Sequence, residues 1–282
     1  DKGSNEALVL ERMQNLHVNL WRTMGKQSVF ATQKLCVTVL LVALWLGQPL
    51  AGLAAENADL LLQSWTNAIR ARDTDTLSRL LNSGFSQVNA ASTKGKTALM
   101  VSAQAAEQGL SQALVDSGAD VNARNQNGGT PLMHAAVSGD MTTVALLLAS
   151  GAKVNVQAGN GWTALGLAAA KGRVSVVDQL LRSGANANLA DVFGWTALIH
   201  AAEQKRLTVV QLLAAQPGIA IDARTADGAT ALHRAAAQGF LAVTQMLIDK
   251  GADPGITDNE GRTPLDYARA AGHPQLLEGL GG

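Results

Sequence analysis

Short apolar blocks alternate with turn residues along most of this chain. Between residues 125 and 158, one apolar block follows Thr130 and ends at Gly139, and a second runs from Val144 to Gly151. Apolar residues three and four positions apart predict amphipathic helices, and glycine permits a sharp reversal after each one. The pattern therefore predicts two short antiparallel helices followed by a polar loop.

The same helix start recurs along the chain at a nearly constant distance. A Thr-Pro-Leu or Thr-Ala-Leu triplet begins at Thr97, Thr130, Thr163, Thr196, Thr230 and Thr263, in steps of 33, 33, 33, 34 and 33 residues. The threonine hydroxyl can cap a helix, and Pro131 and Pro264 suit its first position. A fixed period of this size indicates stacked copies of one unit.

With the core Thr-Pro-Leu-Met-His-Ala-Ala at residues 130–136, this unit resembles the ankyrin repeat. The resemblance covers roughly residues 57–282. It implies an all-α repeat solenoid of stacked ankyrin helix–turn–helix–β-hairpin units. Asn127-Gly128, Asn160-Gly161 and Asp227-Gly228 are dipeptides that favour tight hairpin turns, and we place the hairpins there.

The repeats predict a division into caps and central units. We expect an N-terminal capping repeat at 56–92, five ankyrin repeats at 93–258 and a C-terminal capping repeat at 259–282. Terminal units differ from central ones because each has a single neighbour. In the first cap we predict a helix at 59–71 with Trp65 on its packing side, a turn at Arg72-Asp73 and a second leucine-rich helix.

Two residues depart from the repeat pattern, and one polar position recurs once in each repeat. Ala106 replaces the glycine that ends the first helix in most repeats, so we expect a local shift of the helices there. Lys205 has the same position and would carry about 1–2 kcal/mol of strain in a left-handed conformation. A polar ladder recurs once per repeat, and we expect its side chains to satisfy hairpin backbone groups: Asn89, Asn122, Asn155, Asn188 and Asp222.

The first 55 residues follow a different pattern. Residues 1–23 remain an uninterpreted leader, and residues 24–55 combine lysines, an apolar run at 35–47 and small residues near Ala54. This layout is typical of a secretory signal peptide, which predicts a periplasmic protein of bacterial origin. An uncleaved segment would instead anchor the chain in the inner membrane facing the periplasm, and release from the cell would make the protein secreted.

Composition and motifs argue against several functional classes. Lys+Arg and Asp+Glu both number 22, which gives no basic excess for nucleic acid. We find no catalytic or phosphate-binding motif and expect no enzyme, no cofactor and no metal site. His134 and His200 stand two repeats apart, roughly 16–20 Å at usual helix spacings, too far to share a zinc ion. We expect His233 to form a local hydrogen bond.

A binding surface is the remaining candidate. In ankyrin proteins partners usually contact the hairpin tips and the concave side of the first helices, so the resemblance implies these positions here. Trp162, Phe193 and Trp195 can bury large areas and favour an interface, although the rings could instead pack on neighbouring hairpins. The predicted partner-binding residues are Trp162, Phe193, Trp195, Asn127, Asn160, Lys171, Glu203, Gln204 and Asp227.

The sequence thus predicts a monomeric, non-catalytic scaffold or adaptor that binds another protein by equilibrium recognition. Two alternatives stay open: a secreted effector that binds host proteins, and an accessory subunit that stabilises a periplasmic enzyme.

Overall fold

A computed structural model describes residues 50–280, so the predicted leader and most of the predicted signal segment lie outside the described residues. The chain divides into two units, residues 1–60 and 61–282, and the second holds the repeats. Helix α3, Leu50–Ala71, begins before the predicted cleavage positions. No helix within residues 50–280 is long and apolar enough to cross a membrane.

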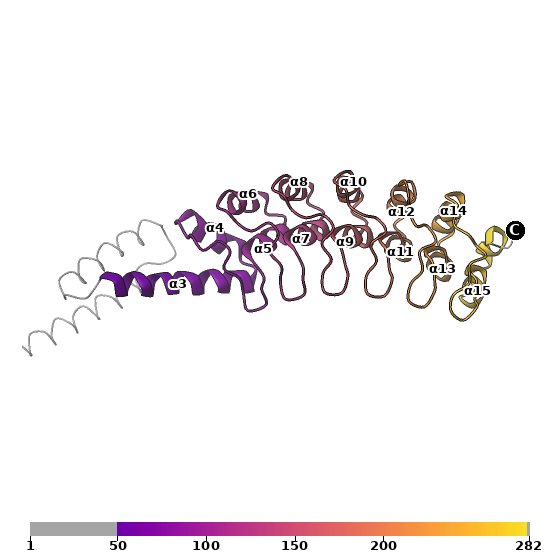
Figure 1. Ribbon diagram of the computed structural model, residues 1–282, viewed down its shortest axis with the longest axis horizontal. Coiled ribbons are helices and arrows are strands. Elements are labelled where there is room, and N and C mark those ends of the chain that lie inside the picture. Colours follow the sequence, from indigo (N-terminus) through magenta and orange to yellow (C-terminus); the bar gives the residue numbers. More distant parts are fainter. Residues whose placement is uncertain (1–49, 281–282) are drawn as a thin grey trace, which may run out of the picture. The chain divides into compact units, whose positions relative to one another are not determined.

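Residues 61–280 form a row of helix pairs (Figure 1). Inner helices pack on inner helices and outer helices on outer helices of adjacent repeats. After α3, the inner helices are α5 (Ala98–Ala105), α7 (Pro131–Ser138), α9 (Ala164–Lys171), α11 (Ala197–Glu203), α13 (Ala231–Ala237) and α15 (Pro264–Ala270). The outer helices are α4 (Thr74–Asn82), α6 (Gln108–Asp116), α8 (Met141–Ala149), α10 (Val174–Arg182), α12 (Leu207–Ala214) and α14 (Leu241–Asp249), and η1 (Pro274–Leu276) and α16 (Leu277–Leu280) close the described chain.

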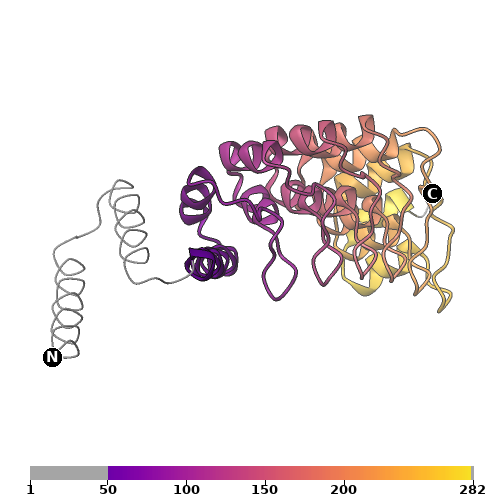
Figure 2. The ribbon, with the colours of Figure 1, turned by 60° about the vertical axis from the view of Figure 1, so that its left-hand side comes forward.

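The loops between repeats all project to the same side of the row (Figure 2). This arrangement confirms the predicted all-α solenoid of stacked units. The predicted β-hairpins lack assigned strands in residues 50–280. Each loop still turns back on itself, closed by a backbone hydrogen bond such as that from the Asn125 amide to the Gly129 carbonyl.

The helix boundaries follow the predicted signals. The Thr130 side chain accepts a hydrogen bond from the Met133 amide, and Gly139 ends the helix with φ +84°. Lys205 and Ala106 are both left-handed, with φ +55° and +60°. The predicted shift around Ala106 is wrong, because α5 and α6 keep the register of α7 and α8 relative to their threonines. The turn between α5 and α6 therefore forms with Ala106 in the left-handed conformation, without a glycine.

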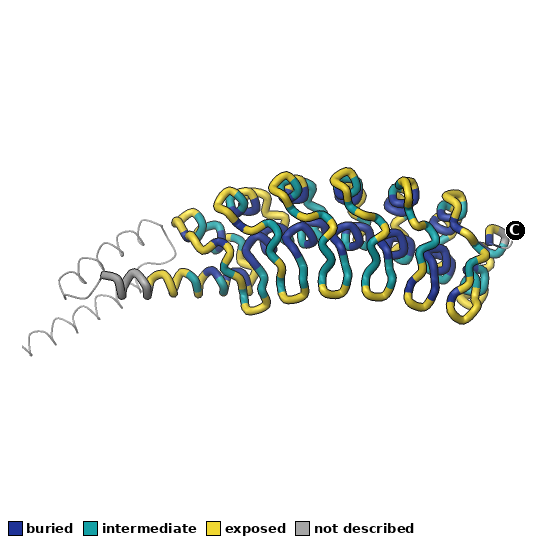
Figure 3. Tube along the Cα trace, viewed as in Figure 1, coloured by how far each residue is buried: buried dark blue, intermediate teal, exposed yellow. Residues whose placement is uncertain are grey.

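Burial is concentrated on the inner helices, whereas the loop tips are exposed (Figure 3). Alanines line these helices, and Ala135, Ala136 and Ala168 are fully buried. Small side chains let neighbouring helices approach closely, which buries apolar area without large rings. In the predicted first cap, Trp65 is fully buried and its ring stacks on Phe85 at 4.5 Å.

The polar ladder is structural, but its predicted partners are wrong. Asn122 donates from Nδ2 to the Gly151 carbonyl at 3.0 Å, and its Oδ1 accepts from the Lys153 amide at 2.8 Å. Both groups lie in the turn that follows the next repeat's outer helix, before the loop at 158–162. Asn89, Asn155 and Asn188 form the equivalent pair of bonds. Each asparagine therefore links its repeat to the following one.

Candidate partner-binding surface

The loops that follow each outer helix are held in one shape. In the loop at 125–129, the Asn125 amide donates to the Gly129 carbonyl at 3.0 Å, and the Gly128 amide donates to the Asn125 carbonyl at 2.8 Å. Gly128 has φ +76°, a conformation in which glycine has no steric cost. This is a type I turn closed by a left-handed glycine, a common hairpin connection.

Loop tips are also linked to one another. The Gly159 amide donates to the Asn127 carbonyl at 2.8 Å, and the Val192 amide donates to the Asn160 carbonyl at 3.1 Å. Equivalent bonds reach the carbonyls of Phe193 and Asp227. The backbone of these predicted contact residues therefore ties neighbouring loops together, and only their side chains remain available for a partner.

A side chain at the start of several loops stiffens them further. Oδ1 of Asp191 accepts from the Phe193 amide at 2.9 Å and from the Trp195 amide at 3.0 Å. Asn125 and Asp258 accept the corresponding pairs of amides in their own loops. Such bonds replace water at turn amides and fix the direction in which the tip side chains point.

The two tryptophans of the predicted surface pack against one histidine. The Trp162 and His200 rings stack with centroids 4.0 Å apart, and the Trp195 ring lies 5.2 Å from the same imidazole. Nε2 of His200 lies 3.2 Å from Oδ2 of Asp191. Burial lowers the pKa of His200, and the Asp191 carboxylate opposes this shift. The tryptophans are thus half-buried parts of the loop frame.

Arg234 continues this stack toward the C-terminus. Its guanidinium lies 4.7 Å from the centre of the Trp195 ring and 2.6 Å from a carboxylate oxygen of Asp227. A cation over an indole face is attracted by the ring quadrupole. Burial raises the pKa of Asp227, but hydrogen bonds from Thr225 and Arg234 outweigh it and lower that pKa. The Asp227 carboxylate is therefore already paired with Arg234 before any partner binds.

Phe193 remains the most exposed aromatic residue of the predicted set. Its side chain is 63% exposed, and the neighbouring Val192 is 61% exposed. Glycines or a small residue occupy the adjoining tips at 159, 161 and 226. Sequence reasoning missed Val192, although its place directly before Phe193 in the tip was a usable signal. It also missed Asp191, whose contacts join the start of its loop to the loop amides and to His200 of the same repeat, and Arg234, whose contact with Trp195 crosses between repeats.

The helix residues of the predicted set form a separate group. Lys171, Glu203 and Gln204 lie at the C-terminal ends of α9 and α11, whereas the loop tips precede the N-terminal ends. A helix of seven or eight residues separates the two groups by roughly 11 Å. Oε1 of Glu203 accepts from Nε2 of Gln238 at 3.1 Å. Asn127 and Asn160 are exposed at the tips.

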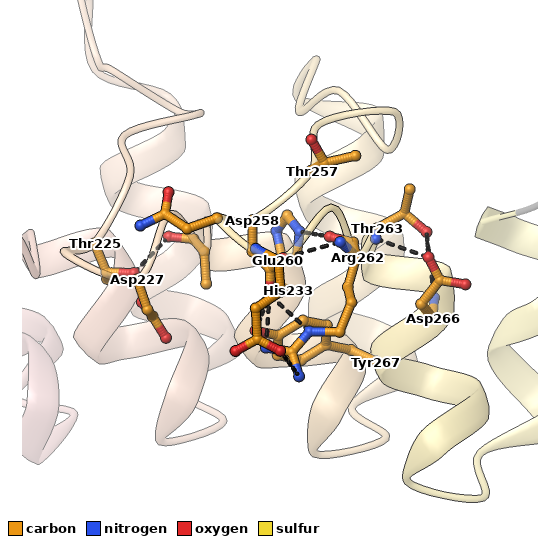
Figure 4. A network of polar contacts seen from close by, with 12 residues as sticks. Thr225, Asp227, His233, Thr257, Asp258, Glu260, Arg262, Thr263, Asp266 and Tyr267 are labelled. Atoms are coloured by element: carbon orange, nitrogen blue, oxygen red, sulfur yellow. Dashed lines mark hydrogen bonds and ion pairs between the residues drawn. The ribbon is translucent and has the colours of Figure 1, made fainter.

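The last loop holds a dense polar network (Figure 4). Oδ2 of Asp258 accepts from Nε of Arg262 and from the Tyr267 hydroxyl, both at 2.8 Å. Burial alone would raise the pKa of Asp258, but bonds from Arg262 and Tyr267 hold it well below its usual range. His233 bonds to Thr230 and, through Nε2, to the Arg262 carbonyl at 3.1 Å, which confirms the predicted local role.

No cluster of three potential metal-binding side chains occurs among the residues that the structure describes. The described residues form a row of loops that are hydrogen-bonded to one another and carry exposed side chains at their tips.

Comparison with known proteins settles the family. A model of three ankyrin repeats matches residues 65–158 and 138–225, and a model of many ankyrin repeats matches residues 212–268. Together these matches cover well over half of the chain. The chain belongs to the ankyrin-repeat family. Repeats of this family are generally non-catalytic modules for protein–protein interaction.

One solved structure and two curated proteins illustrate what the chain is similar to. The crystal structure of the human ASB11 ankyrin repeat domain is similar with a TM-score of 0.67 and 26% identity, covering 77% of this chain and 97% of that one. The ARF GTPase-activating protein GIT1 of Homo sapiens is 53% identical over 53 residues, 19% of this chain and 7% of the relative. Diacylglycerol kinase iota of Mus musculus is 51% identical over 49 residues, 17% and 5% respectively. The ankyrin-repeat chain thus spans less than a tenth of these two curated relatives.

Proposed function

We propose that this ankyrin-repeat chain is a non-catalytic scaffold that binds a partner protein on its loop tips and on the concave face of its inner helices. The observation that supports it best is the exposure of Val192 and Phe193, 61% and 63%, on a loop fixed by hydrogen bonds. Binding to a rigid loop costs little ordering entropy, so apolar burial there is converted efficiently into affinity. Tryptophans behind the tip support it and do not need to touch the partner.

The experiment that tests this proposal is partner capture by the full chain and by a Val192→Ala, Phe193→Ala double variant. Because both side chains project into solvent, the variant should keep the melting temperature within about 2 °C. It should lose capture of the proteins that the natural chain retains. A matched control replaces Val174 and Leu241, which are 37% and 51% exposed at the starts of α10 and α14, by alanine. Equal capture by the tip variant and the natural chain refutes the proposed surface.

We further propose that the chain acts as a monomer outside the cytoplasm, in the periplasm, after export through the segment at 24–55. The basic start and apolar run of that segment support the proposal. Cell fractionation and the mass of the mature N-terminus test it. A periplasmic protein beginning near residue 56 is the expected result, and a cytoplasmic, uncleaved chain contradicts it.

A further inference from the structure

The Asp191 carboxylate is buried at the start of a loop whose tip is exposed. Its side chain is 4% exposed, whereas Val192 and Phe193, which follow it directly, are 61% and 63% exposed. Its Oδ1 accepts from the amides of Phe193 and Trp195, so this single oxygen holds the backbone on both sides of the turn. A carboxylate has a second oxygen, and leaving Oδ2 buried without a donor would cost the free energy of its lost hydration.

His200 supplies the donor to this second oxygen. Its Nε2 lies 3.2 Å from Oδ2 of Asp191, and because an ionised carboxylate can only accept, Nε2 carries the hydrogen. The ring also stacks on Trp162 and lies against Trp195, but a small cavity lined in part by Gly166 adjoins it. Packing therefore does not enclose the imidazole on every side, and the bond to Asp191 is the contact that fixes its direction.

The last repeat contains the same arrangement with a different donor. Oδ1 of Asp258, which starts that loop, accepts from the amides of Glu260 and Arg262, both at 2.9 Å. The Tyr267 hydroxyl donates to Oδ2 at 2.8 Å, and Tyr267 follows its capping threonine by four residues, as His200 does. Nε of Arg262 adds a further bond to the same oxygen. A donor at this position of the inner helix therefore completes a buried loop carboxylate in two repeats.

Repeats without a carboxylate at the start of the loop lack this bond. Asn125 starts its loop with an uncharged amide, and Nε2 of His134, at the position of His200, has no partner among the residues that the structure describes. Ala158 and Leu167 hold the two positions in the following repeat, and neither side chain can form such a bond. Both loops that start with aspartate therefore have a helix donor, and the donor of the exposed apolar tip is a histidine.

We propose that His200 is the positioning residue of the partner-binding surface, because its bond to Asp191 holds the carboxylate that fixes the tip at 192–193. The inference rests on the proposed function, since the shape of this tip matters only if a partner protein contacts it. Without the donor, the Asp191 carboxylate would take up a proton or turn toward water, and its bonds to the amides of Phe193 and Trp195 would weaken. A mobile tip must be ordered when it binds, so affinity would fall even though its two apolar side chains are unchanged.

The first experiment needs no partner and uses NMR on the full chain at neutral pH. The chemical shifts of the two ring nitrogens of His200 should show the hydrogen on Nε2 and a bare Nδ1. A hydrogen on Nδ1 alone would overturn the inference, because Nε2 could then not donate to Asp191.

The second experiment separates the donor from the ring. His200→Phe keeps an aromatic ring without a donor, and His200→Gln keeps a donor at a similar reach without a ring. Hydrogen exchange at the amides of Phe193 and Trp195 should become at least about tenfold faster in the phenylalanine variant and should change less than about threefold in the glutamine variant. The amides of Asn127 and Gly129 are bonded in the same way in another loop and serve as the control that should not change.

Two results of this experiment overturn the inference. One is unchanged exchange at both tip amides in a folded His200→Phe variant. The other is exchange at least about tenfold faster than in the natural chain in a folded His200→Gln variant, which would assign the effect to packing of the ring. The glutamine variant and the ring nitrogens decide the question even where the phenylalanine variant does not fold.

The third experiment links the loop to binding. Its probes are the proteins that the natural chain captures and the Val192→Ala, Phe193→Ala variant does not. His200→Phe should bind them at least about tenfold more weakly, and His200→Tyr, which copies Tyr267, should restore binding. Full binding by a folded His200→Phe variant with faster tip exchange refutes only this inference, whereas undiminished capture by the double tip variant refutes the proposed surface as well.

Discussion

The side chain of Arg206 crosses Gly172 of the preceding repeat and donates from Nε to the Ala170 carbonyl at 3.2 Å. A Cβ atom at Gly172 would lie 2.8 Å from Cδ of Arg206. Arg173 and His273 cross Gly139 and Gly239 in the same way. Where the left-handed residue has a side chain, as at Ala106 and Lys205, the next repeat offers Asp140 or Phe240 at the crossing position instead. A glycine at the left-handed position is therefore paired with a crossing Arg or His from the next repeat, and a residue with a side chain is paired with Asp140 or Phe240.

We predict that Gly172→Ala destabilises the chain more than Gly184→Ala does. Both glycines have positive φ, +70° and +84°, but a Cβ at Gly184 meets nothing within 4 Å. Gly184→Ala should cost about 1 kcal/mol of unfolding free energy from backbone strain. Gly172→Ala should cost about 1 kcal/mol more, because Arg206 must leave its carbonyl. Urea unfolding measures both. In an Arg206→Ala background the extra loss should disappear, and an undiminished loss would rule out the crossing as its cause.

Lys205→Gly should raise the unfolding midpoint, but only slightly. Glycine removes about 1–2 kcal/mol of left-handed strain and adds back about 0.4–1 kcal/mol through a more flexible unfolded chain. It also removes the Lys205 ammonium, which lies 5.1 Å from the centre of the Phe240 ring and contributes about 0.5–1 kcal/mol. Ala106→Gly removes similar strain without losing a cation–π contact, so it should raise the midpoint more. Thermal melting of both variants tests this order, and a larger gain for Lys205→Gly contradicts it.

Contacts between residues close in sequence could be predicted from the sequence, whereas contacts between repeats could not. Thr130 and Gly139 define helix ends through bonds to residues within a few positions, and such local chemistry is legible in one repeat. The contacts of Asn122 and His200 run to other repeats or to another loop, so their partners were assigned wrongly or missed. Trp162 illustrates the limit for the site: its tip position suggested exposure, but the stacked ring of His200 comes from the next repeat and half-buries it.

Asp222→Asn should stabilise the chain by about 0.5–1.5 kcal/mol at neutral pH. Asp222 holds the ladder position, and its Oδ1 accepts from the Asp253 amide at 3.2 Å, but a carboxylate has no hydrogen to donate to the Gly251 carbonyl. Asparagine supplies that donor, as Asn188 does toward Gly218. Urea unfolding of the variant and the natural chain at pH 7 gives the difference. An unchanged or lower free energy of unfolding would show that the missing donor is not limiting.

The same substitution predicts a pH effect with a definite sign. Burial raises the pKa of Asp222 above its ordinary value; the bond from the Asp253 amide lowers it, and the Asp253 charge raises it. A carboxyl whose pKa is higher in the folded state binds more protons there, so its contribution to stability falls as pH rises through that pKa. The advantage of Asp222→Asn should therefore be largest at neutral pH and should shrink in acid. The reverse substitution Asn188→Asp should lower the free energy of unfolding, and this loss should be larger at pH 7 than at pH 4.

Ala158→Asn should stabilise the loop that carries Trp162. Asn125 and Asp191 start the flanking loops and accept from two loop amides each, whereas Ala158 has no side-chain acceptor. The Trp162 amide uses the Oδ1 of Asn160 at 3.3 Å instead, which engages a side chain at the exposed tip. An asparagine at 158 should accept from both amides and add about 1 kcal/mol to the free energy of unfolding. Hydrogen exchange at the Trp162 amide reports the new bond directly. We expect slower exchange together with a higher melting temperature. Unchanged exchange would show that the asparagine at 158 does not accept a hydrogen bond from this amide.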